Sequence, residues 1–344
     1  MATPARFPVG KLPPRVLESL LAMCSIPKGS RVVLGPRFGE DAAVIETRGK
    51  FLVAKTDPIT FTAERIGWYA VNINANDIAT LGARPRWFLA TLLLPERGAT
   101  RPLAKSIFAD ILQACRSLGI TLCGGHTEIT SGLDRPIVVG LMLGEVAKSR
   151  LVRKESQSPG DLVLITKGVA VEGTAILARE KAPQLEAKLG KRFVQRARQL
   201  LFHPGISVVR EALLAARHGE IRAMHDPTEG GLLSGLYELA HAGAVGLRVW
   251  LDKVPVLPET QAFARVLGFD PFALIASGAL LLVASGRTAG NVLAALKRAG
   301  IAGAIIGEVR RASEGIRVLE PGGSRFQSLA LPARDEIARL LSAA

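Results

Sequence analysis

Residues 39–57 read GEDAAVIETRGKFLVAKTD, two apolar segments separated by a polar turn. The segments Ala42–Glu46 and Phe51–Lys55 fit short strands, and the turn between them has the composition of a hairpin loop. Asp41 comes directly before the first strand and Asp57 closely follows the second, so a hairpin would bring both carboxylates to one end. Carboxylates placed beside buried strands call for a cation, which makes this end a candidate metal site.

Three further clusters interrupt apolar segments: Asn74-Ala75-Asn76-Asp77, Gly124-Gly125-His126-Thr127-Glu128 and His225-Asp226-Pro227-Thr228-Glu229-Gly230-Gly231. Magnesium takes oxygen ligands and usually bridges one or two carboxylates to substrate phosphates. Glycine loops let backbone N–H groups approach those phosphates. The clusters together favour a magnesium–nucleotide site and phosphoryl transfer.

The cluster Asn74-Ala75-Asn76-Asp77 falls within a helix predicted over about Ile66–Leu81. Asn and Asp are poor residues for a helix interior, each less favourable than Ala by up to roughly 0.7 kcal/mol. A solvent-facing side of a helix would normally carry Lys, Glu or Arg instead. We therefore expect the crowded set Asn72, Asn74, Asn76 and Asp77 to act as ligands, with Asn76 at the nucleotide and Asp77 at the metal.

The length and composition predict two α/β domains. The 344 residues are 48% hydrophobic, enough for two separate cores, and strand patterns alternate with helix patterns. The charged segment Ala147–Gly160 is the expected boundary, with one domain over residues 1–155 and a second over 156–344. Further predicted strands are Trp87–Leu94, Ile120–Cys123, Pro136–Val146, Leu162–Thr166, Ile221–Met224, Gly246–Leu251, Ala279–Ala284 and Ala302–Val309; further helices are Pro102–Leu118, Val171–Lys181, Ile206–His218, Leu232–Ala242, Ala289–Ala299 and one from Pro332.

The basic charge does not indicate a nucleic-acid partner. Lys and Arg number 44 against 30 Asp and Glu, a net charge of +14, but they are scattered, and aromatic residues make up only 5%. Few platforms for base stacking are left. We expect a solvated basic surface that also attracts anionic nucleotides.

The sequence lacks the patterns of membrane proteins, secreted proteins, cysteine-rich sites and several common enzyme families. No apolar run reaches the roughly 18 residues of a membrane span, and the N-terminus has no signal-peptide pattern, so we expect a cytoplasmic protein. Cys24, Cys115 and Cys123 are too widely spaced for a disulfide framework or a metal site. Gly168–Thr174 follows a strand as a P-loop would, but it lacks the lysine of that motif. GxSxG, HExxH and the protein-kinase motifs are missing as well.

Seven short motifs then occur in the order typical of one superfamily: Glu40-Asp41-Ala42-Ala43-Val44, Thr56-Asp57, Asn76-Asp77-Ile78-Ala79 with Gly82-Ala83-Arg84-Pro85, Gly124-Gly125-His126-Thr127, Asp226-Pro227-Thr228-Glu229-Gly230-Gly231-Leu232, Ser277-Gly278-Ala279-Leu280-Leu281 and Ile306-Gly307-Glu308-Val309. The chain resembles the aminoimidazole ribonucleotide synthetase (PurM-like) superfamily from about residue 39 to 309. No single motif is decisive, but seven in the right order are specific.

The resemblance implies an ATP- and Mg²⁺-dependent enzyme with a β-rich, dimerising N-terminal domain beside a C-terminal α/β domain. It implies that magnesium is held by Asp41, Asp57, Asp77 and Asp226. It also implies a nucleotide loop formed by Gly124, Gly125 and Thr127, to which we add Asn76, Gly230 and Gly231 as expected cofactor contacts. A homodimer is expected as well.

The segment at Asp226 is most similar to the HypE-type branch, whose motif has Arg where Glu229 stands. A HypE-type chain ends in a cysteine that carries a carbamoyl group, whereas residues 333–344 contain no cysteine. We therefore expect ATP to act on a free small molecule, such as a carboxamide, or on a partner's group. A thiamine-monophosphate kinase-like enzyme and a non-catalytic ATP-binding maturation partner are the alternatives.

Two histidines adjoin the predicted phosphate segments. His126 and His225 are the candidate catalytic residues, because either could act as a general acid or base or donate a hydrogen bond to a phosphate. A structural hydrogen bond is the alternative for each of them.

Overall fold

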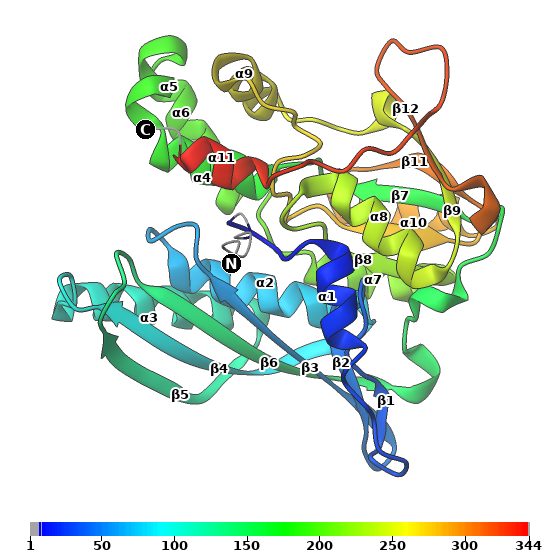
Figure 1. The fold of residues 1–344 in the computed structure, drawn as a ribbon, viewed down its shortest axis with the longest axis horizontal. Helices are drawn as coiled ribbons and strands as arrows, with labels where there is room; N and C mark the ends of the chain where they lie inside the picture. The colour runs from blue at the N-terminus through cyan, green and yellow to red at the C-terminus, as the bar shows by residue number, and fades with distance from the viewer. Residues whose placement is uncertain (1–6, 8, 343–344) are drawn as a thin grey trace, which may run out of the picture.

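The computed structural model describes residue 7 and residues 9–342. Two halves lie one above the other in Figure 1, each with one β-sheet and its own helices. The N-terminal half contains the strands up to residue 147, and the C-terminal half contains those from residue 162 onward. The predicted two-domain α/β architecture is thus confirmed. The expected boundary at residue 155 lies in the connection between the halves and stays a prediction.

The N-terminal sheet has the strand order β1-β2-β3-β6-β4-β5. Its strands are β1 (Val32–Leu34), β2 (Ala43–Glu46), β3 (Lys50–Ile59), β4 (Arg84–Pro95), β5 (Thr121–Thr130) and β6 (Ile137–Ala147). Strands β2 and β3 form the predicted hairpin, with Ala43 opposite Ala54. The positions before β2 and near the end of β3 therefore meet at one edge.

One face of this sheet is covered by α2 (Ile66–Thr80), and α3 (Arg101–Leu118) packs against α2. The two helices approach closely at Gly67, where a Cβ atom would lie 2.5 Å from the Ile107 carbonyl oxygen. Helix α2 is buried along almost its whole length and also contacts the C-terminal half through α7 (Val209–His218) and β8 (Ile221–His225). It therefore forms the central contact between the two halves.

The asparagines of α2 are used inside the protein. Asn74 donates to the carbonyl oxygens of Asp57 and Ala70. Asn76 donates to the Ile206 carbonyl and accepts from the Val208 N–H. Because these amides bind backbone, the local cost of Asn in a helix is offset by contacts that tie α2 to β3 and to the C-terminal half.

The C-terminal sheet has the order β13-β12-β9-β11-β7-β10-β8 and is antiparallel except where β12 pairs with β9. Its strands are β7 (Leu162–Thr166), β8 (Ile221–His225), β9 (Gly246–Trp250), β10 (Leu281–Ala284), β11 (Gly303–Arg310), β12 (Ile316–Leu319) and β13 (Gln327–Ser328). Its helices are α4 (Val171–Glu180), α5 (Ala182–Leu189), α6 (Lys191–Arg198), α7 (Val209–His218), α8 (Gly231–Gly243), α9 (Pro258–Leu267), α10 (Ala289–Arg298) and α11 (Glu336–Ser342). One hydrophobic core continues from the first sheet into this half, and a second lies beneath α8.

The predicted glycine loop after residue 123 is wrong, because β5 runs on to Thr130. Gly124 and Gly125 pair with Leu89 and Ala90 of β4 at a register shift. A Cβ atom on Gly125 would lie 1.9 Å from the Ala90 carbonyl oxygen. The glycine allows two strands to approach here, as glycines at bulges do. The sequence patterns also missed α1 (Pro14–Leu21), α5, α6 and α9.

Within the described part of the chain, no helix is long and apolar enough to cross a membrane.

Candidate active site

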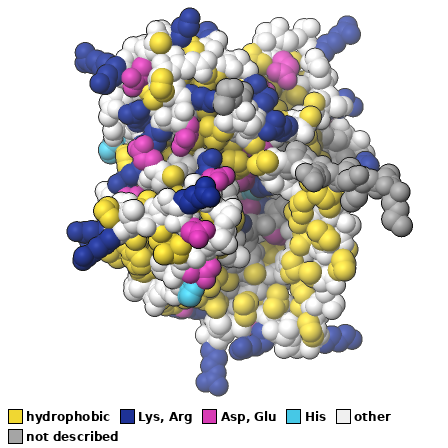
Figure 2. Space-filling model, turned by 60° about the vertical axis from the view of Figure 1, so that its left-hand side comes forward, with side chains coloured by type: hydrophobic (Ala, Val, Ile, Leu, Met, Phe, Trp, Pro, Cys, Tyr) yellow, Lys and Arg dark blue, Asp and Glu magenta, His cyan; other side chains and the backbone are white. Residues whose placement is uncertain are grey.

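A cleft of about 1100 Å³ lies between the two halves. Its walls come from the residues before α1, the β2–β3 hairpin, the segment after β8, helix α8 and residues 331–335. Figure 2 shows a hollow between the halves that holds acidic side chains, with hydrophobic side chains around it. All four predicted metal ligands, Asp41, Asp57, Asp77 and Asp226, line this cleft.

Each of the four aspartates comes from a different element. Asp41 precedes β2, Asp57 lies in β3, Asp77 lies in the last turn of α2, and Asp226 follows β8. The ammonium group of Lys55 joins two of them, since its Nζ lies 3.1 Å from Asp77 and 3.6 Å from Asp57. The hairpin and the α2–β8 contact thus bring together carboxylates that are 185 positions apart between Asp41 and Asp226.

Asp226 and Asp77 have the electrostatics of a cation site. Neither carboxylate oxygen of Asp226 has a hydrogen-bond partner among the described residues, and the side chain is fully buried. Burial and the charges of Asp77 and Asp41 raise the pKa of Asp226 well above its usual value. Burial, opposed by Lys55, raises the pKa of Asp77 to about 6. Buried carboxylates without partners are costly, and a divalent cation would remove that cost, so the donor set fits magnesium.

His225 lies beside the acidic cluster, held between two carboxylates. Its Nδ1 lies 2.7 Å from Asp41 Oδ1, and its Nε2 lies 2.8 Å from Glu238 Oε2. Burial acts to lower the pKa of His225, but the neighbouring carboxylates outweigh it and raise the pKa. An imidazolium that donates from both nitrogens fits this arrangement. Since both nitrogens are engaged, His225 positions Asp41, which lies within 4.8 Å of Asp226.

Two lysines that sequence reasoning missed complete the charge balance. Lys154 Nζ lies 3.0 Å from Asp41 Oδ2 and is buried. Lys11 Nζ lies 3.3 Å from Glu238 and donates to the Thr228 hydroxyl at 3.0 Å, so the segment before α1 is held to the C-terminal half. Lys154 lies in the connection between the halves, where nothing in the sequence pattern marks it.

Lys55 could have been found from the strand pattern. Residues two apart on a strand point to the same face, so Lys55 had to lie on the same side as Asp57. A lysine two positions before a proposed metal ligand was therefore a detectable signal. It places a fixed positive charge beside the carboxylates.

The glycines after Asp226 shape the start of α8. Gly230 lines the cleft with φ of 77°, and its N–H donates to Asp335 at 3.0 Å. Gly231 has φ of 62°, and a Cβ atom there would lie 2.5 Å from the Phe272 carbonyl oxygen. Gly231 therefore allows close packing against residues 272–274, and only Gly230 faces the cleft.

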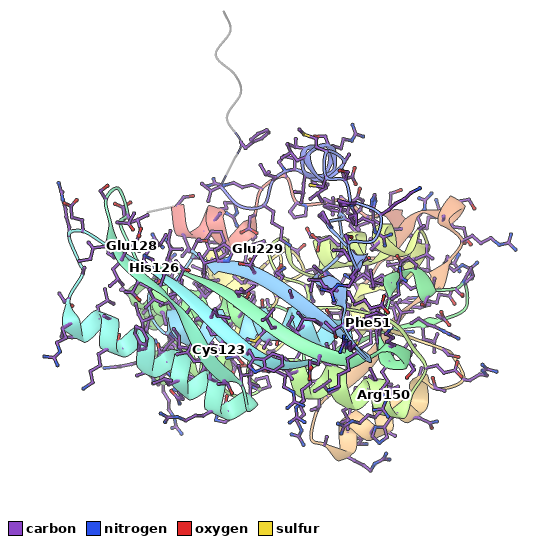
Figure 3. All side chains as sticks on the ribbon, turned by 90° about the horizontal axis from the view of Figure 1, so that it is seen from below. Phe51, Cys123, His126, Glu128, Arg150 and Glu229 are labelled. Atoms are coloured by element: carbon purple, nitrogen blue, oxygen red, sulfur yellow. The ribbon has the colours of Figure 1, made fainter. Side chains whose placement is uncertain are left out.

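Four predicted site residues lie away from the cleft in this chain. Gly124, Gly125, His126 and Thr127 are exposed on β5, at the edge of the N-terminal sheet, and do not line the cleft. His126 Nε2 lies 3.2 Å from Glu128 Oε2 on the same strand, and the two side chains are labelled together in Figure 3. Asn76 is fully buried against backbone, which gives it a structural role instead of the expected nucleotide contact.

Family models match most of the chain. The model described as AIR synthase related protein, N-terminal domain, matches residues 39–146, and the model of the C-terminal domain matches residues 158–319. The chain is 27% identical over 308 residues to a putative hydrogenase expression/formation protein of Methanocaldococcus jannaschii, covering 88% of each. It is 28% identical over 282 residues to the carbamoyl dehydratase HypE of Rhizobium leguminosarum bv. viciae, covering 79% of this chain and 77% of that protein.

Solved structures share the fold. The hydrogenase maturation protein HypE in complex with ATP has a TM-score of 0.68 at 24% identity, covering 87% of this chain and 90% of that one. The HypE–HypF complex has a TM-score of 0.70 at 24% identity, and the match covers 85% of this chain and 93% of that one. AaThiL complexed with AMPPCP and TMP has a TM-score of 0.65 at 20% identity, covering 83% and 88%.

Proposed function

Because the chain belongs to the AIR synthase related protein family, we propose that it is a magnesium- and ATP-dependent enzyme that phosphorylates an oxygen of a small substrate or carboxamide. The observation that carries the proposal is the buried, unpartnered carboxylate of Asp226 beside Asp41 and Asp77 in the interdomain cleft. The ATP bound by a HypE of the same fold and the carbamoyl dehydratase name of a relative support it.

The aspartates and Lys55 would have different roles in the site. Asp77 and Asp226 would hold magnesium together with Asp41 and Asp57, and the metal would neutralise charge on the phosphates. Lys55 already lies between two of these carboxylates and would donate to a phosphate oxygen once magnesium takes its place. Phosphoryl transfer needs mainly positioning and charge neutralisation, which a cleft lined by carboxylates from both halves can provide.

His225 would act on this site as a positioning residue. Its contact with Asp41 fixes one carboxylate, while its contact with Glu238 ties that carboxylate to α8. Asp41 and Asp226 would then keep their separation when a cation binds. Gly230, at the start of α8, would leave room for the nucleotide at the wall of the cleft.

Calorimetry with magnesium-ATP tests the proposal. Asp57→Asn and Asp77→Asn should each weaken binding at least about tenfold, since each removes a charged magnesium ligand. Asp134→Asn, in the exposed turn between β5 and β6, is the matched control and should bind as wild type does. A chelator should abolish binding to the wild type. Unchanged affinity in both cleft variants would contradict the assignment.

We further propose a homodimer formed through the open face of the N-terminal sheet. Strands β3 to β6 lie at the front of Figure 3 with no helix over them. Three large apolar side chains on neighbouring strands are exposed there or at the edge: Trp87 at 36%, Ile129 at 64% and Leu141 at 38%. Gly124, Gly125, His126 and Thr127 would reach a nucleotide only from a second copy. Light scattering should give a dimer, and a monomer at micromolar concentration would contradict this.

A further inference from the structure

A small side pocket adjoins the cleft. Six residues line both spaces: Asp57, Pro58, Thr60, Phe61, Thr228 and Glu229. The side pocket has a volume of about 30 Å³. One water needs roughly 10–15 Å³, so the pocket has room for a functional group of a few atoms.

Two polar groups at the inner wall of the pocket have no partner beyond each other among the described residues. Glu172, in the first turn of α4, is 3% exposed, and Ser277 is fully buried. Neither Glu172 Oε2 nor Ser277 Oγ has a hydrogen-bond partner among the described residues beyond the other member of this pair. The backbone N–H of Glu172 donates to the Ser277 carbonyl at 3.2 Å, which holds the two residues side by side. Buried groups left in this state each cost roughly 1–3 kcal/mol, so a ligand that binds them would recover that cost.

The charge of the pocket selects among ligands. Its ionisable lining residues are all acidic, namely Asp57, Glu172 and Glu229, and neither Lys nor Arg lines it. The remaining wall is largely apolar, with Ile73, Ile176 and Ile275. An anionic group would meet Asp57 and Glu229, whose partner lysines, Lys55 and Lys11, lie outside the lining. Burial raises the pKa of Glu172 to about 8, so its carboxyl carries a proton at neutral pH. A group with both a donor and an acceptor, as a primary amide has, therefore matches this carboxyl and the Ser277 hydroxyl.

We propose that this pocket is the acceptor subsite, in which Glu172 and Ser277 bind a small hydrogen-bond-donating, non-anionic group such as a primary amide or an amine. The inference rests on the proposed function, which places the phosphates at the Asp77–Asp226 end of the cleft. Asp57 lines both the cleft and the pocket, so a group seated against Glu172 would extend toward the metal-binding end. An acceptor that presents a carboxylate or phosphate at this point would be rejected.

Saturation-transfer NMR with acetamide and acetate tests the subsite on protein without nucleotide. We expect the acetamide signal in the wild type to exceed the acetate signal at least about threefold. Glu172→Leu should lower acetamide binding about fivefold, because an apolar side chain of similar size removes the acceptor. Glu172→Gln keeps a carbonyl acceptor and should retain binding. Glu180→Leu, at the exposed end of the same helix, is the control and should bind as wild type does.

Three results would overturn the proposal: equal signals from acetate and acetamide, unchanged binding in Glu172→Leu, or an equal loss in the Glu180→Leu control. A thermal melt of each variant shows whether a loss reflects unfolding instead, and Ser277→Ala then provides the second test, with a smaller loss of acetamide expected. Magnesium-ATP calorimetry on the wild type is a separate measurement. Failure to bind ATP would contradict the proposed function. Acetamide binding that depends on Glu172 would still show that the side pocket binds an amide.

Discussion

Two polar clusters that resemble each other in sequence have opposite surroundings in the structure. The segment from His225 to Gly231 is buried at the cleft, and its histidine is held by two carboxylates. The segment from Gly124 to Glu128 is exposed on an edge strand, and its histidine makes a polar contact with Glu128 on the same strand. A histidine and acidic residue beside glycines therefore do not by themselves indicate a site within one copy of the chain. Burial without a hydrogen-bond partner distinguishes the two clusters.

The largest difference in the free energy of unfolding is expected between substitutions of the two histidines. His225→Gln should lower the free energy of unfolding by about 3 kcal/mol, because it removes the charge that separates Asp41 from Glu238 in a buried position. His126→Gln is the matched control and should change it by less than about 0.5 kcal/mol, since exposed pairs contribute little. Chemical denaturation measures both. Equal effects would remove the distinction between the two clusters.

The next largest difference in stability is expected between two glycines, one close to neighbouring backbone and one with open space around it. Gly125→Ala should lower the free energy of unfolding by about 2 kcal/mol or more, because a Cβ atom would collide with the Ala90 carbonyl. Gly290→Ala, a helical glycine with nothing within 4 Å, is the control and should be neutral or stabilising. If residues 124–128 formed a flexible loop, Gly125→Ala would also be tolerated. A thermal melt would then show no difference between the two variants.

The smallest effect, measured per pH unit, is expected from Glu172. Burial raises its pKa to about 8, so the folded state keeps a proton that the unfolded state releases above its ordinary pKa. The contribution of Glu172 to wild-type stability should therefore fall as pH rises from about 4.5 to 8, by up to about 1.4 kcal/mol per unit. Glu172→Gln lacks this loss, so its stability relative to wild type should increase over that range. Glu180→Gln should show no such trend, and a flat difference for Glu172→Gln would contradict the buried, unpaired carboxyl.

The sequence allowed much of the fold to be predicted, because strong local patterns mark it. Strand β2, helix α2 and strand β7 were predicted at or near their observed bounds, since apolar periodicity and turn residues agree there. The predicted end of β3 at Lys55 is wrong, because the strand continues to Ile59 and Asp57 lies within it. Helices α5 and α6 were missed, as their packing surfaces become apparent only against α4 and α9. The pair Gly124-Gly125 was read as a loop because close strand approach and loop flexibility both use glycine.

The site was predicted less completely than the fold. The four aspartates were identified because acidic residues beside apolar strands are unusual, and the structure brings all four to one cleft. Asn76 was assigned to a nucleotide because its contacts with residues 206–208 depend on a segment 130 positions away. The local sequence around Lys154 and Glu172 does not indicate a role for either residue, because their contacts are with residues far away in the chain. Lys154 contacts Asp41, and Glu172 lies beside Ser277.

The measurement that most directly tests the account is a crystal structure grown with manganese and a non-hydrolysable ATP analogue. Manganese takes the oxygen ligands of magnesium and gives an anomalous signal. We predict an anomalous peak about 2.0–2.3 Å from carboxylate oxygens of Asp226 and Asp77, with the phosphates in the cleft. A peak at His126 and Glu128 on β5, or no peak at the aspartates when the analogue is bound, would contradict the central claim.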